Sequence, residues 1–128
     1  MNILVTGASG FIGTNLIKEL KKGNDTIYSF DNNSSIKSQK GVKKLNSWEI
    51  RELVYHFGEY SRVVPSFRDA AYVWTTNLWG TSFVLEQCVK WGAKIIYSAS
   101  SSKFGYNEHL CPYSWSKSKM VELIKNYN

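Results

Sequence analysis

The chain has 128 residues, of which 43% are hydrophobic, and this length suits one compact domain and is too short for two. Its formal net charge of +6 could attract nucleic acid or the phosphates of a nucleotide, but the sequence contains no nucleic-acid-binding motif. Part of this charge lies in KSQKGVKK at 37–44, a composition typical of a solvated loop. Two cysteines, Cys88 and Cys111, are too few to predict a disulfide framework or a zinc site.

The N-terminal segment MNILVTGASG lacks the basic region and the long apolar core of a secretory signal. No apolar run in the sequence approaches the roughly 20 residues that a membrane-spanning helix needs. We therefore expect a soluble protein of the cytoplasm, with no membrane or nucleic-acid partner and no metal.

The first predicted elements are a strand and a helix joined by a glycine-rich turn. The apolar run at 2–7 is typical of a buried parallel strand. Residues 11–23 predict a helix, with Ile12, Leu16 and Leu20 at helical spacing and a glycine at its end.

Further short elements follow along the chain. Strands are predicted at 26–30 and 53–57, and the polar stretch between them predicts a loop with at most a short strand near 42–45. The segment SWEIRE at 47–52 predicts a helical turn with Ser47 as its N-cap.

The second half of the chain predicts two longer helices around one strand. Residues 69–91 form the longest helical pattern and end before Gly92, a strand is predicted at 94–100, and the last helix begins near Pro112, whose φ suits a first helical position. Strands and helices that alternate in this way indicate a parallel sheet covered on both faces. We expect an α/β fold, a Rossmann-type doubly wound sheet of four to five strands, that occupies 1–128 as a single domain.

The segment TGASGFIG places Gly7, Gly10 and Gly13 between the first strand and the first helix. The first glycine permits a tight turn, the second lets the backbone approach a pyrophosphate, and the third allows close helix–strand packing. The free N–H groups and positive dipole end of the helix would bind the phosphates. The spacing is G-x-x-G-x-x-G, whereas the usual dinucleotide fingerprint is G-x-G-x-x-G. The context nevertheless favours a dinucleotide site over glycines that only form a turn.

Asp31 ends the second predicted strand, 18 residues after Gly13. A carboxylate at this position can accept hydrogen bonds from both ribose hydroxyls of an adenosine, and its charge would repel a 2′-phosphate. We therefore expect NAD and not NADP as the cofactor. The alternative is an aspartate that only starts the turn DNNSS.

Six segments in order resemble the extended short-chain dehydrogenases/reductases: VTGASGFIG, FDNNSS, VYHFGEYSRVVPSF, NLWGTSFVLEQC, IIYSASSSKFG and PYSWSKSKMVE. More narrowly, they resemble the NAD-dependent nucleotide-sugar epimerases and dehydratases, of which UDP-glucose 4-epimerase is the nearest type. The resemblance covers nearly the whole chain. It implies a nucleotide-sugar substrate and an epimerase, an isomerase that works by transient hydride transfer to bound NAD.

The resemblance implies a catalytic set of Ser100, Tyr113 and Lys117, with Ser101 as the alternative serine one position along. Tyr113 would remove a hydroxyl proton as the phenolate, and the positive charge of Lys117, one helical turn away, would favour that phenolate. Lys117 would also bind the ribose hydroxyls, and Ser100 would orient the substrate hydroxyl. A Tyr-x-x-x-Lys pair also occurs by chance on surface helices, so the surrounding motifs carry this interpretation.

The expected cofactor contacts combine the glycine turn, the strand ends and positions implied by the resemblance. They are Gly7, Gly10, Phe11, Ile12, Gly13, Asp31, Asn32, Phe57, Gly58, Asn77, Tyr113 and Lys117. Among these, the resemblance gives Asn77 a supporting role for the cofactor site and the central helix.

The sequence departs from the resembled family in two respects. The segment between Asp31 and His56 is short, and no aspartate in VKKLNSWEI matches the one that contacts adenine in the family. The family also continues for well over a hundred residues beyond the Tyr-Lys pair, so we expect no C-terminal substrate domain within these residues. The alternatives to an epimerase are therefore a catalytically silent NAD-binding module and one half of a split enzyme.

The predicted helix at 69–91 carries large apolar residues on more than one face. Trp74, Leu78 and Leu85 form one stripe, and further apolar residues lie around the helix at Tyr72, Trp79, Phe83 and Val89. Because a sheet covers only one face of a helix, the second face predicts another protein surface. The resemblance implies a homodimer through helices 69–91 and 112–128, whereas the alternative is that the tryptophans only fill a small core.

Overall fold

The structure is a computed structural model that describes residues 1–32, 40–45, 51–103 and 109–127. The chain folds into two compact units. The first consists of Met1–Gly58 and Gln87–Tyr97, and the second of Glu59–Glu86 and Ser98–Asn128.

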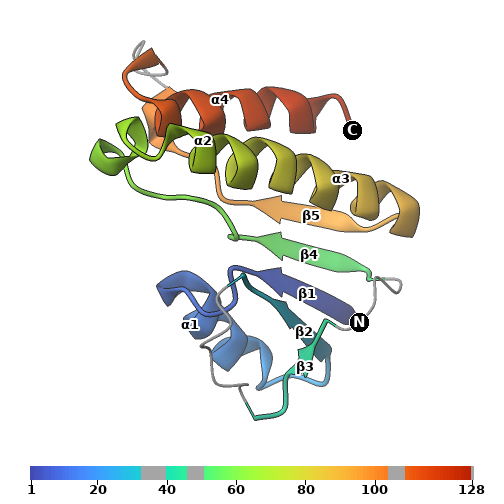
Figure 1. Ribbon diagram of the computed structural model, residues 1–128. Helices are drawn as coiled ribbons and strands as arrows, with labels where there is room; N and C mark the ends of the chain where they lie inside the picture. The colour runs from blue at the N-terminus through green and yellow to red at the C-terminus, as the bar shows by residue number, and fades with distance from the viewer. Residues whose placement is uncertain (33–39, 46–50, 104–108, 128) are drawn as a thin grey trace. The chain divides into compact units, whose positions relative to one another are not determined.

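The first unit contains a five-stranded parallel sheet (Figure 1). Its strand order is β3-β2-β1-β4-β5. The strands are β1 (Asn2–Thr6), β2 (Thr26–Phe30), β3 (Lys43–Lys44), β4 (Leu53–His56) and β5 (Lys94–Tyr97). The chain extends the sheet from β1 to one side and then returns to extend it from β1 to the other side. This reversal of direction is the doubly wound topology predicted from the sequence, and ligands bind at such switch points.

Helix α1 (Phe11–Leu20) packs its Ile17 side chain into the core of the first unit. The strand residues of this core are Ile3, Val5 and Ile27, and β1 is fully buried from Ile3 to Thr6 because neighbouring strands flank it on both sides. Ile12, which the sequence places at helical spacing with Leu16 and Leu20, does not pack into this core, since its side chain is 58% exposed. The buried positions of α1 are Gly13 and Ile17, four residues apart, and Ile12 points about 100° away from Gly13 around the helix.

The helices of the second unit include most of the long segment predicted at 69–91. The structure divides this segment into α2 (Ala70–Val73), the π-helical η2 (Trp74–Trp79) and α3 (Gly80–Trp91), whose residues from Gln87 onward belong to the first unit. The prediction is therefore correct in extent, but it did not include the π-helical segment. Gly92 ends the helix with φ 65°, the left-handed conformation of a helix C-terminus.

The remaining elements of the second unit are two 3₁₀ helices, η1 (Val64–Phe67) and η3 (Ser101–Lys103), and the helix α4 (Pro112–Lys125). Helix α4 lies against α2 and η2. It begins at Pro112 as predicted, and Cys111 acts as the N-cap because its Sγ accepts a hydrogen bond from the Ser114 backbone N–H at 3.3 Å.

The remaining predictions concern two strands and one helical turn. Strand β5 ends at Tyr97, three residues earlier than predicted, and the short strand β3 lies within the predicted 42–45. The helical turn predicted at 47–52 falls mainly on 46–50, which lie outside the described residues.

Three further features concern the described part of the chain. No helix there is both long enough and apolar enough to cross a membrane. Within the same residues no group of three or more His, Cys, Asp or Glu side chains is placed to hold a metal ion. Both Cys88 and Cys111 are buried free thiols, and burial raises the pKa of Cys88 to about 11.

Candidate functional site

The glycine turn lies at the carboxyl end of β1, in the first unit. Gly7 has φ 63°, and a Cβ atom at this position would lie 2.6 Å from the carbonyl carbon of Phe57. A Cβ atom at Gly13 would collide with the carbonyl oxygen of Gly7 and the Cα atom of Ala8. Both positions therefore require glycine for packing, which brings the start of α1 close to the ends of β1 and β4.

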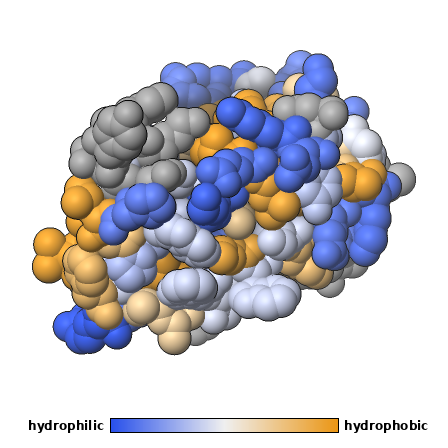
Figure 2. All heavy atoms as spheres, turned by 90° about the horizontal axis from the view of Figure 1, so that it is seen from above, coloured by the Kyte–Doolittle hydropathy of each residue, from blue (hydrophilic) through white to orange (hydrophobic). Residues whose placement is uncertain are grey.

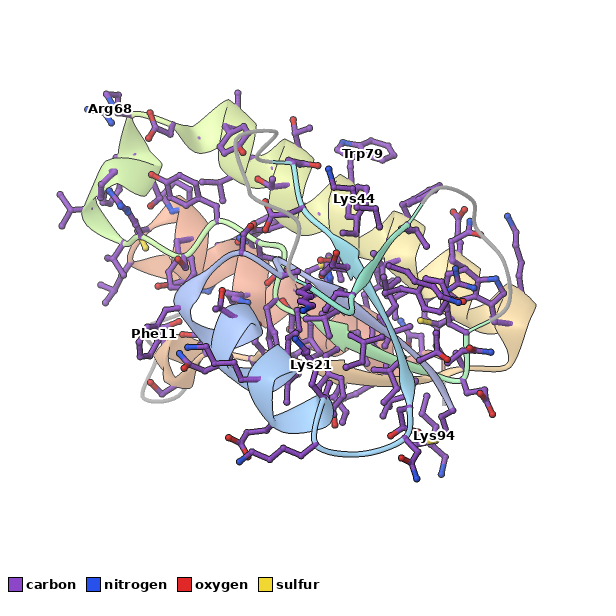
Figure 3. All side chains as sticks on the ribbon, turned by 90° about the horizontal axis from the view of Figure 1, so that it is seen from below. Phe11, Lys21, Lys44, Arg68, Trp79 and Lys94 are labelled. Atoms are coloured by element: carbon purple, nitrogen blue, oxygen red, sulfur yellow. The ribbon has the colours of Figure 1, made fainter. Side chains whose placement is uncertain are left out.

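The N-terminus of α1 remains accessible. Gly10 is its N-cap, is exposed and makes no side-chain capping hydrogen bond, so the first backbone N–H groups of the helix are not capped by that residue. Phe11 is 86% exposed, and its side chain projects away from the ribbon at the start of α1 (Figure 3). An accessible helix N-terminus behind a glycine turn suits the pyrophosphate of a dinucleotide.

Asp31 follows β2 and contacts the same turn. Its Oδ2 atom accepts hydrogen bonds from the backbone N–H of Ser9 at 3.2 Å and from the Ser9 hydroxyl. The side chain is half-buried, and the next residue, Asn32, is exposed. The structure thus places the carboxylate beside the glycine turn, where the sequence predicted a ribose contact. The role of Ser9 as its partner was not predicted.

A buried polar network joins the ends of β1 and β4 below the turn. The Thr6 hydroxyl lies 2.6 Å from Nδ1 of His56, and the Gly58 backbone N–H donates to Thr6 Oγ1 at 3.0 Å. This network holds the backbone of Phe57 and Gly58, two of the predicted cofactor contacts, against Gly7. Sequence reasoning missed Thr6 and His56, and the only available signal was two polar residues at the ends of apolar strands.

The second unit contains a buried polar cluster around Lys117. The Lys117 ammonium forms an ion pair with Glu59 and donates hydrogen bonds to the Ser98 carbonyl and, at 3.3 Å, to the Ser98 hydroxyl. The other carboxylate oxygen of Glu59 accepts a hydrogen bond from the Thr81 hydroxyl at 2.6 Å. Lys117 is thus buried, and its catalytic role stays a prediction. Glu59, Thr81 and Ser98 were not predicted.

Asn77 lies in the π-helical segment η2 and is fully buried. Its Oδ1 accepts a hydrogen bond from the Tyr60 N–H at 2.7 Å, and its Nδ2 donates to the Tyr60 carbonyl at 3.1 Å and to the Ser116 hydroxyl at 3.0 Å. Asn77 therefore ties the segment after Gly58 to helix α4. The role that the resemblance implies for Asn77 at the cofactor site stays a prediction.

Tyr113 is the second residue of α4 and is half-buried. Its carbonyl accepts a hydrogen bond from the Ser116 hydroxyl at 2.8 Å. Burial tends to raise the pKa of the Cys111 thiol at the N-cap of this helix, but hydrogen bonds from Ser114, Ser66 and the Tyr113 backbone together outweigh it, and the net shift is downward. Tyr113 and Lys117 thus share one helix whose start is fixed by a proline and a capped turn.

The Ser100 hydroxyl lies 2.8 Å from the Ser102 hydroxyl and accepts a hydrogen bond from the Ser102 N–H at 3.2 Å. The alternative serine, Ser101, is exposed at the start of η3, and η3 packs against α4. The second unit therefore holds both candidate serines together with Tyr113 and Lys117.

Tyr60 is a second tyrosine near the Lys117 cluster. Burial and its hydrogen bond to Asp69, at 2.9 Å, raise the pKa of its phenol. The hydrogen bond from the Arg68 guanidinium lowers the pKa of Asp69 most, and the hydrogen bond from the Tyr60 hydroxyl lowers it further. Tyr60 therefore keeps its proton and is a poor candidate for the general base.

The chain is similar to known proteins in sequence and in fold. The sequence profile described as the NAD dependent epimerase/dehydratase family matches residues 3–128. The chain is 27% identical to the ADP-L-glycero-D-manno-heptose-6-epimerase of Cupriavidus pinatubonensis, over 98% of this chain and 46% of that protein.

Two solved structures extend the comparison. The UDP-glucose 4-epimerase of Thermotoga maritima, in a structure with UDP-glucose, superposes with a TM-score of 0.86 at 26% identity, over 99% of this chain and 51% of that one. The UDP-glucose 4-epimerase of Bifidobacterium longum, in complex with NAD⁺ and UDP, superposes with a TM-score of 0.82 at 23% identity, over 98% and 48%. This chain thus spans about half the length of the proteins it matches.

Proposed function

Because this chain belongs to the NAD-dependent epimerase/dehydratase family, we propose that it binds NAD and acts as a nucleotide-sugar epimerase of the UDP-glucose/UDP-galactose 4-epimerase type. The observation that carries the proposal is that a buried Lys117 lies one helical turn from Tyr113 on α4, in a chain whose glycine turn exposes a helix N-terminus.

The residues of the first unit would hold the cofactor. The N–H groups of α1 behind Gly10 would bind the pyrophosphate, with Phe11 and Ile12 as the first helical contacts. Asp31 would accept hydrogen bonds from the adenosine ribose, which favours NAD over NADP. Further contacts within this unit would come from the positions at Gly7, Gly13, Asn32, Phe57 and Gly58, and Asn77 of the second unit would support the cofactor site.

The residues of the second unit would handle the proton. NAD, when bound, would supply the acceptor for a hydride from the sugar carbon and the donor that returns it to the opposite face of that carbon. Tyr113 would remove the proton of the sugar hydroxyl, and Ser100 would orient that hydroxyl by a hydrogen bond. Lys117 would hold the ribose of the cofactor and favour the ionised phenol of Tyr113.

The direct test is to incubate the purified protein and NAD with UDP-glucose or UDP-galactose and to measure interconversion of the two sugars. We expect interconversion of both. NAD binding without turnover on a panel of nucleotide sugars would contradict the epimerase proposal.

That contrary result would favour the second candidate function, a silent NAD-binding module or one half of a split enzyme. The observation in its favour is that the chain covers only about half the length of the epimerases that it matches. In a split enzyme, the residues that bind the sugar would lie outside 1–128.

Replacing the phenol tests the proposed base. Tyr113→Phe is expected to lower turnover by about a hundredfold or more, the usual contribution of a general base, and to leave the Kd for NAD within about twofold. Tyr127→Phe, at an exposed tyrosine beyond the end of α4, serves as the control and should retain activity. Activity that survives in the Tyr113→Phe protein would show that another group is the base.

We also propose that the chain forms a homodimer through helices 69–91 and 112–128. The support is that Tyr72, Trp79 and Phe83 remain exposed on the first of these helices. That residues 1–128 act as one NAD-binding domain in the cytoplasm is likewise a prediction.

A further inference from the structure

A pocket in the first unit lies at the edge of the sheet where the parallel strands begin. Strands β1, β4 and β5 all start at this edge, whereas the glycine turn follows the carboxyl end of β1. Figure 3 shows Lys94, at this edge, well apart from Phe11 at the start of α1. The pocket has a volume of about 410 Å³, within the range of roughly 300–1,000 Å³ that small-molecule sites have. It is lined by Met1, Glu52, Leu53, Trp91, Gly92 and Lys94.

The backbone places two charged residues of this pocket next to each other. The Glu52 N–H donates to the Asn2 carbonyl at 2.9 Å, and the Lys94 N–H donates to the Glu52 carbonyl at 3.1 Å. These bonds extend the hydrogen-bonded ladder of β1, β4 and β5 to the start of the strands. The positions of Glu52 and Lys94 therefore follow from the sheet itself.

The charges of these two residues have opposite signs but do not neutralise each other. Within the part of the chain that the structure describes, neither Lys94 nor Glu52 forms an ion pair. One carboxylate oxygen of Glu52, Oε2, accepts a hydrogen bond from the Asn2 N–H at 2.6 Å. Both side chains belong to exposed residues. The Oε1 atom of Glu52 and the Lys94 ammonium are thus accessible to a ligand.

The chain terminus adds a charge that is already paired. The Met1 ammonium lies 2.7 Å from the Asp25 carboxylate. The charged groups around the pocket are therefore two cations, Met1 and Lys94, and two carboxylates, Asp25 and Glu52, and their charges sum to zero. This balance does not favour a ligand with a net charge, whereas a zwitterion can place its two charges opposite Glu52 and Lys94.

The remaining walls of the pocket are apolar or open. Trp91 ends α3 and is half-buried, and Leu53 packs against the core of the first unit. An indole ring offers an aromatic ligand a face for stacking. Gly92 leaves open space beside these residues, since no atom lies within 4 Å of a Cβ atom at its position. The pocket thus combines an aromatic wall and free space with two opposite charges.

We propose that this pocket binds a free amino acid with an aromatic side chain. The carboxylate of the ligand would pair with Lys94, its ammonium with Oε1 of Glu52, and its ring would stack on Trp91. None of these residues is assigned to the cofactor or to proton transfer. The inference therefore goes beyond the proposed function and does not rest on it.

The test titrates L-phenylalanine into isotope-labelled protein without NAD and follows the backbone amide signals by NMR. We expect saturable shifts at Leu53, Gly92 and Lys94, with a Kd of about 1 mM or lower. Phenylpropionate lacks the ammonium and phenethylamine lacks the carboxylate, so each should bind about tenfold more weakly through the loss of one charged hydrogen bond. Absence of saturable shifts with L-phenylalanine, or equal binding of the three compounds, would overturn the inference.

Substitutions assign each charge of the ligand to one residue. Lys94→Gln should weaken the binding of L-phenylalanine about tenfold and leave that of phenethylamine unchanged, because phenethylamine has no carboxylate. Glu52→Gln keeps an acceptor for the Asn2 N–H and should weaken L-phenylalanine to a similar extent, with phenylpropionate unaffected. The matched control is Lys18→Gln, at an exposed lysine of α1 outside the pocket. A control effect as large as that of Lys94→Gln would indicate unspecific charge attraction and refute the site.

Filling the open space at Gly92 tests the position of the ligand without a change of charge. Asparagine tolerates the left-handed conformation of this residue, whose φ is 65°. Gly92→Asn should therefore abolish the shifts with all three compounds and leave the circular dichroism spectrum unchanged. Undiminished binding to the folded variant would overturn the inference. Because no titration contains NAD, failure of the proposed epimerase function would leave these outcomes as they are.

Discussion

At the scale of single residues, two glycines have the same strained backbone conformation but differ in the space available for a side chain. Gly7 and Gly92 have nearly the same positive φ, 63° and 65°. A Cβ atom at Gly7 would lie 2.6 Å from the Phe57 backbone, whereas nothing lies within 4 Å of one at Gly92. Both positions strain a non-glycine residue, but only Gly7 also has no room for a side chain.

Alanine substitutions should separate the two effects. Gly92→Ala is expected to lower the free energy of unfolding by about 1 kcal/mol, the cost of a left-handed conformation. Gly7→Ala should cost about 2 kcal/mol more, because the backbone of Phe57 has to move as well. Urea unfolding of both variants measures the difference. Equal losses would show that the contact at Gly7 relaxes without cost.

The candidate site residues differ in how well their partners could be predicted. The contact of Asp31 with the glycine turn follows from strand ends that meet at one edge of a parallel sheet, and its predicted contact with a ribose stays a prediction. The sequence did not predict a role for Glu59, because this residue follows a strand and has the local pattern of an ordinary loop residue. Its partner Lys117 is 58 positions away, and no local pattern connects a carboxylate to a lysine at that separation.

At the scale of elements, the long helix at 69–91 contains a π-helical segment that holds Asn77. The apolar pattern predicted the extent of the helix, but a pattern with period 3.6 does not indicate a wider turn within it. Asn77 then makes three hydrogen bonds, two to the Tyr60 backbone and one to Ser116 on α4. This side chain links three segments of the second unit.

Removing the Asn77 amide should therefore destabilise that unit. Asn77→Ala leaves the Tyr60 N–H and carbonyl without this partner, and we expect a loss of about 2–4 kcal/mol in the free energy of unfolding. Thr75→Ala, at an exposed position of the same segment, should change it by about 0.5 kcal/mol or less. The two values come from denaturant unfolding followed by circular dichroism. A loss for Asn77→Ala as small as that of the control would contradict the linking role.

At the scale of the whole molecule, large apolar side chains remain on the surface of the long helical segment. Trp79 is 75% exposed and projects away from the ribbon (Figure 3), and Tyr72 and Phe83 are also exposed. Figure 2, the view from above, shows hydrophobic areas lying among hydrophilic ones. The idea that the tryptophans only fill a small core does not fit Trp79, and this exposure supports the proposed homodimer.

Charged substitutions on this surface should shift the oligomeric state. The combined change Trp79→Lys and Phe83→Lys is expected to convert a dimer to a monomer at micromolar concentration, because two charges would be buried in the interface. Sedimentation velocity compares this variant with Lys90→Glu, a charge change at an exposed polar position of α3. A monomeric original protein would refute the dimer.

The sequence by itself determined the fold class, the glycine turn and the family, since each depends on local patterns or on motifs in a fixed order. The five-stranded parallel sheet confirms the predicted doubly wound fold, and the family match confirms the resemblance and NAD as the cofactor of the family. Only the tertiary structure decided that Ile17 and not Ile12 packs on the sheet, that Asn77 links Tyr60 to α4, and that Glu59 holds Lys117. These contacts join residues far apart in the chain or depend on small rotations about a helix axis, so they follow from packing and not from any local pattern.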